Sequence, residues 1–355
     1  MKKILFINPF GIGDVLFTTP AVRAVKEAIT DSFIGYWCNE RVKGLFQNNP
    51  RVDKVFGLSR GDIKKIYQQS RLEGVKQFFG LLRQIKREKF DCALDFSLDH
   101  RYALIAKILG IRRRIGFDYK GRGRPLTDKI TLKGYYRRHV VEYYLDLLRL
   151  IAITPREKTL ELFVSQESKA KAKAMLLENG IHDHDLVIGL VPAAGASWGK
   201  DASLKHWSTY KFARLADTLI AEYNAKIILL GDASERGVAE TIGALMRSKA
   251  VDFTGKTSLS DLAALIGCLK LLVANDGGPL HMAVALDVPT VSIFGPVDES
   301  VYGPYPPSER HIVVKKTLEC RPCYQKFALG DCERDRECIS SIGVDEVLTA
   351  IRRLM

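Results

Sequence analysis

Short apolar runs alternate along the first half of the chain with segments whose apolar residues follow helical spacing. The runs at residues 3–8, 33–38, 53–57 and 90–96 contain many β-forming residues, and residues 72–88 have a helical pattern. This alternation is typical of an α/β domain in which helices cover both faces of a mostly parallel sheet.

The same alternation starts again near residue 186 and predicts a second α/β domain of the doubly wound type. Strand patterns occur at residues 186–191, 226–230, 250–254, 270–274 and 289–294, and helical patterns at 208–221, 234–246, 260–268 and from Pro279. We place one domain at residues 1–165 and the second at 180–340, with a polar, charge-rich stretch at 164–185 between them. A last helix within residues 341–355 could pack on either domain.

The composition is that of a soluble globular protein of two domains. The chain has 355 residues, of which 46% are hydrophobic and 27% charged. No apolar run reaches the roughly 18–20 residues that a membrane-spanning helix needs. The N-terminal apolar run breaks at Asn8-Pro9, which argues against a signal peptide and favours a cytoplasmic protein.

Positive charge is concentrated in the first half of the chain. The net charge is +13, and residues 101–138 contain twelve Lys or Arg but two acids, Asp118 and Asp128. Such an excess favours an anionic partner such as a phosphate group, a nucleic acid or a membrane surface. A merely solvated surface is the alternative.

Seven cysteines fall into two groups. Cys38, Cys92 and Cys268 stand singly in apolar surroundings, as small core residues do. The other four are spaced as Cys320-x2-Cys323-x8-Cys332-x5-Cys338. A cytosolic protein does not usually hold a disulfide framework, and the spacing differs from common paired zinc motifs, so a metal or redox site stays a hypothesis.

The loop after the strand at 270–274 is the strongest candidate for binding chemistry, because ligands of such sheets bind beyond the carboxyl ends of the strands. It reads Asp276-Gly277-Gly278-Pro279-Leu280-His281. The glycines allow a close approach of the backbone, and the free N–H groups of the following helix attract an anion. Asp276 can accept hydrogen bonds from sugar hydroxyls, and His281 lies in the first helical turn. The alternative is an ordinary helix start with a core histidine.

A second loop, at residues 189–207, carries Ser197 and Lys205. The serine and nearby backbone N–H groups can bind phosphate oxygens, and the lysine can neutralise a diphosphate. The spacing is not that of a Walker A loop, which argues against a nucleotide hydrolase. The alternative is a basic surface loop with Trp207 in the core.

Two further loops place a carboxylate directly after a strand. Asp14 follows Gly11-Ile12-Gly13 at the start of a helix and is a candidate general base. Glu235 follows the strand at 226–230, where it can hold ribose hydroxyls. For both residues, a role in the start of a helix is the alternative.

Together these loops resemble those of the bacterial heptosyltransferases, glycosyltransferase family 9, over nearly the whole chain. The resemblance depends on five motifs in the same order: GIGDVLFTTPA at 11–21, GASWG with KHW within 195–207, LLGDASE at 229–235, DGGPLHMAVALDVPTVSIFGP at 276–296 and CRPCYQKFALGDC at 320–332.

The resemblance implies a GT-B fold of two Rossmann-like domains that face a central cleft, with the acceptor bound by the first and the donor by the second. It implies an inverting, metal-independent transfer of heptose from ADP-L-glycero-β-D-manno-heptose to an inner-core lipopolysaccharide sugar. The residues that it identifies are Asp14 as the base, Ser197 and Lys205 at the diphosphate, Glu235 at the ribose, and Asp276, Gly277, Gly278 and His281 at the donor sugar and phosphates.

Two positions depart from the family pattern. Thr257 stands where some members have a methionine against adenine, which leaves recognition of the base in doubt. Gly277 stands where some members have Thr or Ser, which removes a hydroxyl that could bind phosphate.

The resemblance offers an explanation for the positive charge of the first half. The acceptor that it implies is anionic and anchored at the inner face of the inner membrane. We expect Arg112, Arg113, Arg114, Arg122 and Arg124, with the helix at 72–89, to dock that surface. We further expect a peripheral, monomeric protein with no cofactor other than its nucleotide-sugar substrate.

Other functions stay open at this point. A glycosyltransferase of the same build could use another nucleotide sugar, and a nucleotide sensor without activity is conceivable. A nucleic-acid-binding protein is suggested by charge alone, since no recognisable binding module is present.

Overall fold

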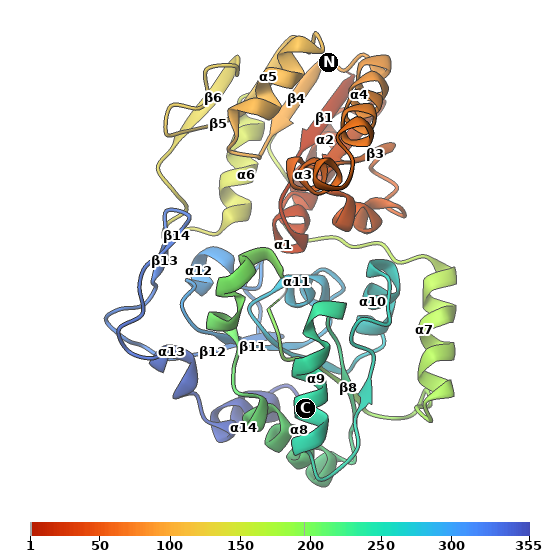
Figure 1. The fold of residues 1–355 in the computed structure, drawn as a ribbon, viewed down its shortest axis with the longest axis vertical. Coiled ribbons are helices and arrows are strands. Elements are labelled where there is room, and N and C mark those ends of the chain that lie inside the picture. The colour runs from red at the N-terminus through yellow and green to blue at the C-terminus, as the bar shows by residue number, and fades with distance from the viewer. Residues whose placement is uncertain (1, 195) are drawn as a thin grey trace. The chain divides into compact units, whose positions relative to one another are not determined.

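A computed structural model describes residues 2–194 and 196–355, and it describes the backbone alone at residues 60, 65, 196–198 and 200. The chain forms two compact units, Met1–Phe163 and Val164–Met355. Each unit contains its own six-stranded sheet (Figure 1).

The sheet of the first unit is parallel throughout and has the order β3-β2-β1-β4-β5-β6. Its strands are β1 (Lys3–Ile7), β2 (Phe33–Cys38), β3 (Lys54–Gly57), β4 (Cys92–Asp95), β5 (Arg113–Tyr119) and β6 (Asp128–Leu132). The apolar runs predicted β1 to β4. The pattern did not reveal β5 and β6, because charged residues interrupt their apolar positions.

Helices cover both faces of this sheet. They are α1 (Ile12–Leu16), α2 (Thr19–Ala28), α3 (Arg60–Gln69), α4 (Arg71–Glu88), α5 (His100–Ile108) and α6 (Val140–Arg149), with a 3₁₀ helix η1 at Glu40–Phe46. Several begin at side-chain caps that the sequence supplies. Ser59 and Asp62 form a capping box at α3, and Ser70 caps α4.

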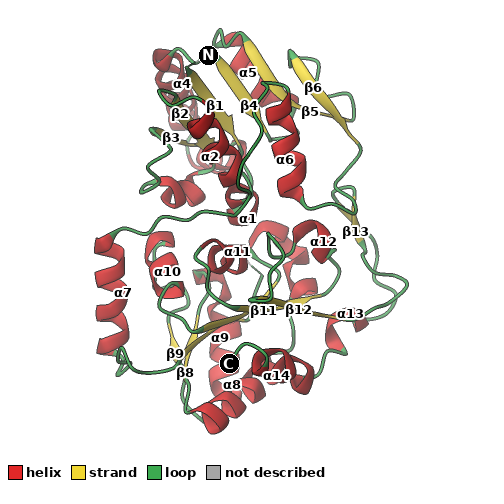
Figure 2. Cartoon of the chain, turned by 180° about the vertical axis from the view of Figure 1, so that it is seen from behind, coloured by secondary structure: helices red, strands yellow, loops and turns green. Residues whose placement is uncertain are grey.

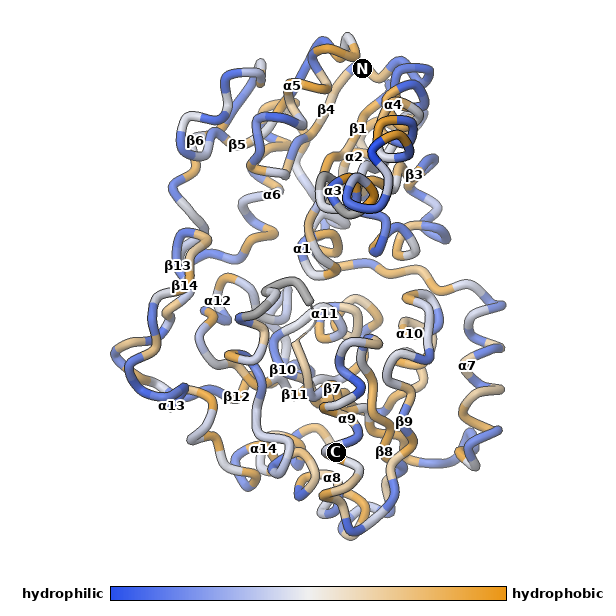
Figure 3. The backbone as a smooth tube through the Cα atoms, viewed as in Figure 1, coloured by the Kyte–Doolittle hydropathy of each residue, from blue (hydrophilic) through white to orange (hydrophobic). Residues whose placement is uncertain are grey.

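The two faces of the first sheet bury different residues. On one face, Trp37 and Leu5 pack against Ile85 of α4 and Tyr102 of α5. On the other face, Phe96 stacks on Phe6 and meets Tyr144 of α6 edge to face, and α2 packs against α6 (Figure 2). Apolar residues therefore fill β1 and β4, as the hydropathy colouring also shows (Figure 3).

The sheet of the second unit is also parallel and has the order β12-β11-β10-β7-β8-β9. Its strands are β7 (Val187–Val191), β8 (Lys226–Leu229), β9 (Val251–Asp252), β10 (Leu271–Asn275), β11 (Thr290–Phe294) and β12 (His311–Lys315), and a separate hairpin is formed by β13 (Tyr324–Gln325) and β14 (Ala328–Leu329). The pattern along the sequence predicted all of the six except β12, an edge strand in which only Val314 is buried.

The helices of this unit include the stretch that the sequence suggested as an interdomain region. They are α7 (Gln166–Glu178), η2 (Ala196–Lys205), α8 (Thr209–Tyr223), η3 (Ala233–Glu235), α9 (Arg236–Leu245), α10 (Leu259–Ile266), α11 (Gly278–Ala285), α12 (Glu299–Tyr302), α13 (Glu337–Ser340) and α14 (Val344–Arg352). Residues 164–185 are thus mostly the helix α7, which packs on α10 and is linked to it by the ion pair of Lys171 and Asp261.

The last helix belongs to the second unit. Val347 and Ile351 of α14 are fully buried in the core that also contains Trp207 and Phe212. The indole N–H of Trp207 donates to the carbonyl of Ile342 over 2.9 Å. Of the two packing partners that the sequence allowed for this helix, the structure shows the second domain.

Candidate active site

The strand orders locate a binding crevice in each unit. In a doubly wound sheet, ligands bind where successive connections leave the sheet in opposite directions. This point lies between β7 and β10 in the second unit and between β1 and β4 in the first. The loops that the sequence singled out follow β10, β7 and β1.

The loop after β10 forms the start of α11. Gly277 is the N-cap, Gly278 begins the helix, and Pro279 occupies its first turn. A Cβ on Gly277 would lie 3.2 Å from the carbonyl oxygen of Ala194, which follows β7. The two loops therefore approach each other too closely for an unadjusted side chain at residue 277. The N–H groups of the first turn of α11 make this a natural anion site.

Lys205 and Asp276 form an ion pair beside this helix start. The Lys205 ammonium lies 2.7 Å from Oδ2 of Asp276, and the two side chains are only 9% and 7% exposed. Burial of two charges is costly unless each fixes the other in place. The pair thus sets the position of a buried cation at the crevice between β7 and β10.

Asn275 connects the loop after β10 to the loop after β7 by hydrogen bonds, and the sequence analysis did not predict this role. It is fully buried, its Nδ2 donates to the Pro192 carbonyl over 2.6 Å, and its Oδ1 accepts from the Trp207 backbone N–H over 3.2 Å. An asparagine that ends a buried strand is the only signal that the sequence offered for this role.

His281 is 4% exposed in the first turns of α11. Burial, with a smaller effect of the nearby Lys205 charge, lowers the pKa of His281 to about 3. The imidazole is therefore neutral near pH 7, and it can offer a hydrogen bond to a ligand but no positive charge. His206 lies nearby, since its Nε2 accepts from the Ala194 N–H over 3.2 Å.

Glu235 lies over the end of β8, the neighbour of β7. Its Oε2 accepts from the Asp232 N–H over 2.8 Å in a capping box at η3. A Cβ on Gly231 would lie 2.8 Å from that oxygen, so the carboxylate covers the strand end. Glu235 thus caps the start of η3 and also lies at the end of the sheet where ligands bind. Thr257 lies partly exposed in the turn before α10.

Five of the seven residues predicted to bind the donor thus gather beyond the carboxyl ends of β10 and β7, namely Lys205, Asp276, Gly277, Gly278 and His281. Glu235 stands one strand away. The side chain of Ser197, which the sequence assigned to the diphosphate, lies outside the described residues.

Asp14 occupies the corresponding edge of the first unit. It lies in the first turn of α1, directly after β1, and is partly exposed. The buried Asn8 fixes this turn, because its Nδ2 donates to the Asp14 carbonyl over 2.9 Å. Burial raises the pKa of Tyr36 well above its usual value, and the negative charge of Asp14 adds to this.

A second carboxyl group, Asp95, closes the other side of this crevice. It ends β4 in register with Ile7 of β1 and is 5% exposed. Burial raises the pKa of Asp95 to about 7, although the Ser97 N–H donates to its Oδ1 over 2.8 Å. The sequence pattern did not single out Asp95, because this residue ends an apolar run that predicts a strand.

The structure separates the five arginines expected to bind the acceptor. Arg113 pairs with Asp128 and donates to the Leu150 carbonyl, and Arg114 donates to three backbone carbonyls, including that of Pro125. With the exposed Arg112 they stand at the beginning of β5, the edge of the sheet opposite Asp14.

The other two arginines, Arg122 and Arg124, are exposed in the loop that follows β5, and the guanidinium of Arg122 lies 6.0 Å from the ring centre of Tyr119. Among the five, Arg122 and Arg124 thus follow a strand end on the Asp14 side.

The four cysteines of the tail are unpaired thiols. The Cys323 thiol contacts the Cys320 carbonyl at 3.1 Å, and the Arg336 N–H donates to Sγ of Cys332 at 3.2 Å. Within residues 2–194 and 196–355, no group of three or more His, Cys, Asp or Glu residues is arranged to hold a metal ion.

Two parallel sheets, each with polar residues at its switch point, and a buried cation beside a helix start in the second, are features of α/β proteins that bind phosphate-bearing ligands such as nucleotides. The family model of glycosyltransferase family 9 (heptosyltransferase) matches residues 78–331. The chain therefore belongs to this heptosyltransferase family, as the motifs of the sequence predicted.

Curated relatives agree over the length of the chain. Lipopolysaccharide heptosyltransferase 3 of Escherichia coli K12 is 23% identical over 348 residues, which are 97% of this chain and 95% of that protein. Lipopolysaccharide heptosyltransferase 2 of Salmonella typhimurium is 27% identical over 310 residues, 83% of each chain.

Solved structures confirm the predicted two-domain GT-B fold. A family 9 glycosyltransferase from Veillonella parvula has a TM-score of 0.82 at 23% identity and covers 99% of this chain and 97% of its own. An E. coli heptosyltransferase solved with ADP has a TM-score of 0.74 at 18% identity, with coverages of 99% and 100%. A further structure of that enzyme contains ADP-2-deoxy-2-fluoro heptose.

Proposed function

We propose that this glycosyltransferase moves heptose from ADP-L-glycero-β-D-manno-heptose to an inner-core lipopolysaccharide acceptor, with inversion at the anomeric carbon and without a metal ion. The buried Lys205–Asp276 pair beside the start of α11 is the observation that carries the proposal. Two similar E. coli structures hold ADP and an ADP-heptose analogue, which supports an adenosine diphosphate donor.

The donor diphosphate fits the polar groups beyond β7 and β10. As the glycosidic bond to the leaving group breaks, negative charge grows on the phosphate oxygens. The Lys205 ammonium and the first N–H groups of α11 stabilise that charge, and they are already in position before the reaction. This is the role that a divalent cation has in metal-dependent glycosyltransferases, so these residues make a metal unnecessary.

Asp14 is the proposed general base. An acceptor hydroxyl must lose a proton as its oxygen attacks the anomeric carbon, and attack opposite the leaving group inverts that centre. The Asp14 carboxylate takes the proton, a step that typically contributes about 10²–10⁴-fold to the rate. Glu235 is positioned to accept hydrogen bonds from the ribose hydroxyls, and neutral His281 to bond the sugar or phosphates.

A donor panel tests the reaction. The purified protein is incubated with ADP-heptose, UDP-sugars or GDP-sugars and an inner-core acceptor, in buffer with and without EDTA. We expect transfer from ADP-heptose alone, unaffected by EDTA, and an inverted linkage by NMR. Turnover with a UDP- or GDP-sugar would instead support the alternative, a glycosyltransferase of the same build that uses another nucleotide sugar.

The proposed place of work is the inner face of the inner membrane, with the protein as a peripheral monomer. No helix of the described residues is long and apolar enough to cross a bilayer. Sedimentation velocity of the purified protein checks the monomer, and a fractionation of cells checks the location. Filter binding with DNA and RNA checks that the positive charge does not serve nucleic acids.

A further inference from the structure

The helices α4 and α5 of the first domain expose large apolar side chains to solvent. Leu72 and Phe79 of α4 are 82% and 58% exposed, and Leu104 and Ile108 of α5 are 42% and 70% exposed. Isolated exposed apolar residues are common, but groups on adjacent elements mark contact surfaces. Both helices pack on the same face of the sheet, in one core cluster with Trp37.

These residues form stripes on the outer sides of the two helices, in which cations alternate with apolar groups. On α4, Leu72, Lys76, Phe79 and Arg83 are separated by four, three and four positions, which places them on one side of the helix. On α5, Lys107 lies beside the apolar pair Leu104 and Ile108.

The cations of the stripes have no acidic partner. Lys76, Arg83 and Lys107 are exposed, and among the described residues none of them forms an ion pair. Residues 60–89 contain nine Lys or Arg against three acids. An exposed apolar surface with unneutralised cations between its apolar groups complements a bilayer with anionic headgroups.

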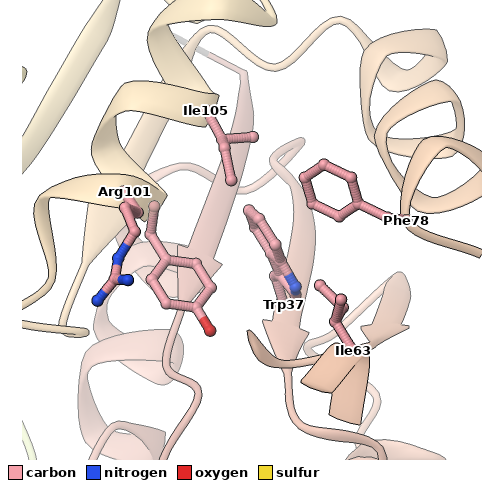
Figure 4. Close-up of a pocket in the computed structure, with 6 residues that line it drawn as sticks. Trp37, Ile63, Phe78, Arg101 and Ile105 are labelled. Carbon is pink, nitrogen blue, oxygen red and sulfur yellow. The ribbon is translucent and has the colours of Figure 1, made fainter. Parts of the chain in front are cut away.

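A narrow apolar cavity opens between the same two helices (Figure 4). Its volume of about 200 Å³ is smaller than the ~300–1,000 Å³ of sites that enclose a whole small molecule. Phe78 of α4 and Ile105 of α5 face each other across it, with Trp37 of β2 between them. Arg101 lines the same cavity, and its guanidinium group is paired with Asp99 over 2.7 Å. The cavity suits a thin apolar chain below a charged headgroup.

We propose that the outer face of α4 and α5, termed here the lipid face and formed by Leu72, Lys76, Phe79, Arg83, Leu104, Lys107 and Ile108, docks on an anionic phospholipid bilayer, with the end of one acyl chain in the cavity between the helices. Phe79 and Ile108 enter the headgroup region, and the three cations contact phosphates. The link to the proposed function is that an enzyme docked on the membrane would meet an acceptor anchored there. The binding itself needs no substrate.

Co-sedimentation with vesicles tests the proposal. The full chain is mixed at low salt with vesicles of phosphatidylcholine alone or with about a third of phosphatidylglycerol. We expect binding to the anionic vesicles, weaker binding at high salt because of screening, and about tenfold weaker binding of the double variant Phe79→Ser/Ile108→Ser. The matched control is Leu177→Ser/Leu245→Ser, which removes two apolar side chains of similar exposure from α7 and α9 and should bind as the parent does.

The cavity has its own readout, because Trp37 lines it. Vesicles whose acyl chains carry bromine should quench tryptophan fluorescence of the parent, and Phe78→Trp, which adds an indole to the cavity, should increase the quenched fraction. Quenching that is unchanged by Phe78→Trp would exclude a chain in the cavity.

Three results would overturn the proposal. These are absence of binding to anionic vesicles, equal binding by the parent and the Phe79→Ser/Ile108→Ser variant, or a parent dimer that this variant converts to a monomer, which would assign the face to a second copy of the chain. Turnover with a water-soluble acceptor fragment should be unchanged in the variant. Loss of heptose transfer in the parent would therefore refute the proposed reaction while leaving the vesicle result intact.

Discussion

At the scale of single residues, the carboxyl groups of Asp14 and Asp95 and the buried ion pair of Lys205 and Asp276 lead to testable predictions. Asp14 and Asp95 stand on the two sides of the crevice between β1 and β4, yet only Asp95 is held in a fully buried place. Asp14 was predicted from its position after a glycine-rich turn. Asp95 was not predicted, because its protonation depends on its burial and on its neighbours in space. Neither is visible in the order of residues along the chain.

Removal of the Asp14 carboxylate should stop turnover without loss of the donor. Asp14→Asn keeps the shape and the helix start but cannot accept a proton, so we expect kcat to fall about 10²–10⁴-fold. Donor affinity, measured by calorimetry with ADP, should change little, because the donor residues belong to the other unit. Near-normal turnover would refute the assignment of the base, and Asp31→Asn, at an exposed position, is the control.

Asp95 should make stability depend on pH. Its folded pKa of about 7 exceeds that of an unfolded aspartate, so the folded state binds the extra proton between about pH 4 and pH 7. The stability that this gives is present at pH 4 and is lost as the pH rises through 7. Asp95→Asn should thus gain up to about 4 kcal/mol over the parent at pH 8 and little at pH 4.

Urea unfolding at the two pH values measures this difference in the free energy of unfolding. An equal effect of Asp95→Asn at pH 4 and pH 8 would show that the carboxyl group titrates normally.

The ion pair of Lys205 and Asp276, at the proposed donor site, should behave as a unit. Lys205→Met leaves Asp276 buried without its cation, and Asp276→Leu does the reverse, so each should lower stability by about 3–5 kcal/mol. The double variant should cost less than the sum, which thermal unfolding of the four proteins can measure. Additive losses would mean that the two side chains do not depend on each other.

At the scale of elements, the close approach of two loops decides what residue 277 can be. The helix start of α11 and the loop after β7 meet at Gly277, where a Cβ would lie 3.2–3.3 Å from the Ala194 backbone. Some family members have Thr or Ser at this position. In this chain the backbones of the two loops pack so closely that a side chain at residue 277 would need them to move apart.

A branched side chain at this position should displace the helix start. We expect Gly277→Val to raise the Kd for ADP about tenfold or more, since the anion-binding N–H groups of α11 move away from the Ala194 loop. Gly243→Ala is the matched control, because a Cβ there meets nothing within 4 Å in α9. The control should keep ADP binding and gain roughly 0.5–1 kcal/mol of stability.

At the scale of the whole molecule, the pattern of apolar runs predicted two α/β domains and nine of the twelve strands described in their two sheets, and it missed β5, β6 and β12. It failed for β5, where Arg113 and Arg114 begin a buried strand because their guanidinium groups bond carbonyls and Asp128 at its edge. The order of the motifs pointed to the residues proposed to bind the donor. The positions of Asn275 and Asp95 became evident only from the fold. Likewise, only the packing in the structure shows that the last helix, α14, belongs to the second unit.

The two cores should respond separately to damage. Ile351 is fully buried in the core of the second unit, so Ile351→Ala should lower the free energy of unfolding of that unit by about 2–5 kcal/mol. The first unit should be unaffected. Fluorescence of Trp207 and Trp37, which belong to the two different cores, follows each transition during denaturation. A joint shift of both transitions would contradict independent cores.

The burial of α14 in the second unit has a consequence for synthesis on the ribosome. The first unit consists of residues up to Phe163, so every strand of its sheet is available once that segment has left the exit tunnel. The core of the second unit needs Val347 and Ile351, near the end of the chain. At ~5–20 residues per second, the nascent chain therefore carries a finished first unit and an incomplete second unit for tens of seconds. Chaperones that meet this protein during translation should bind the second half.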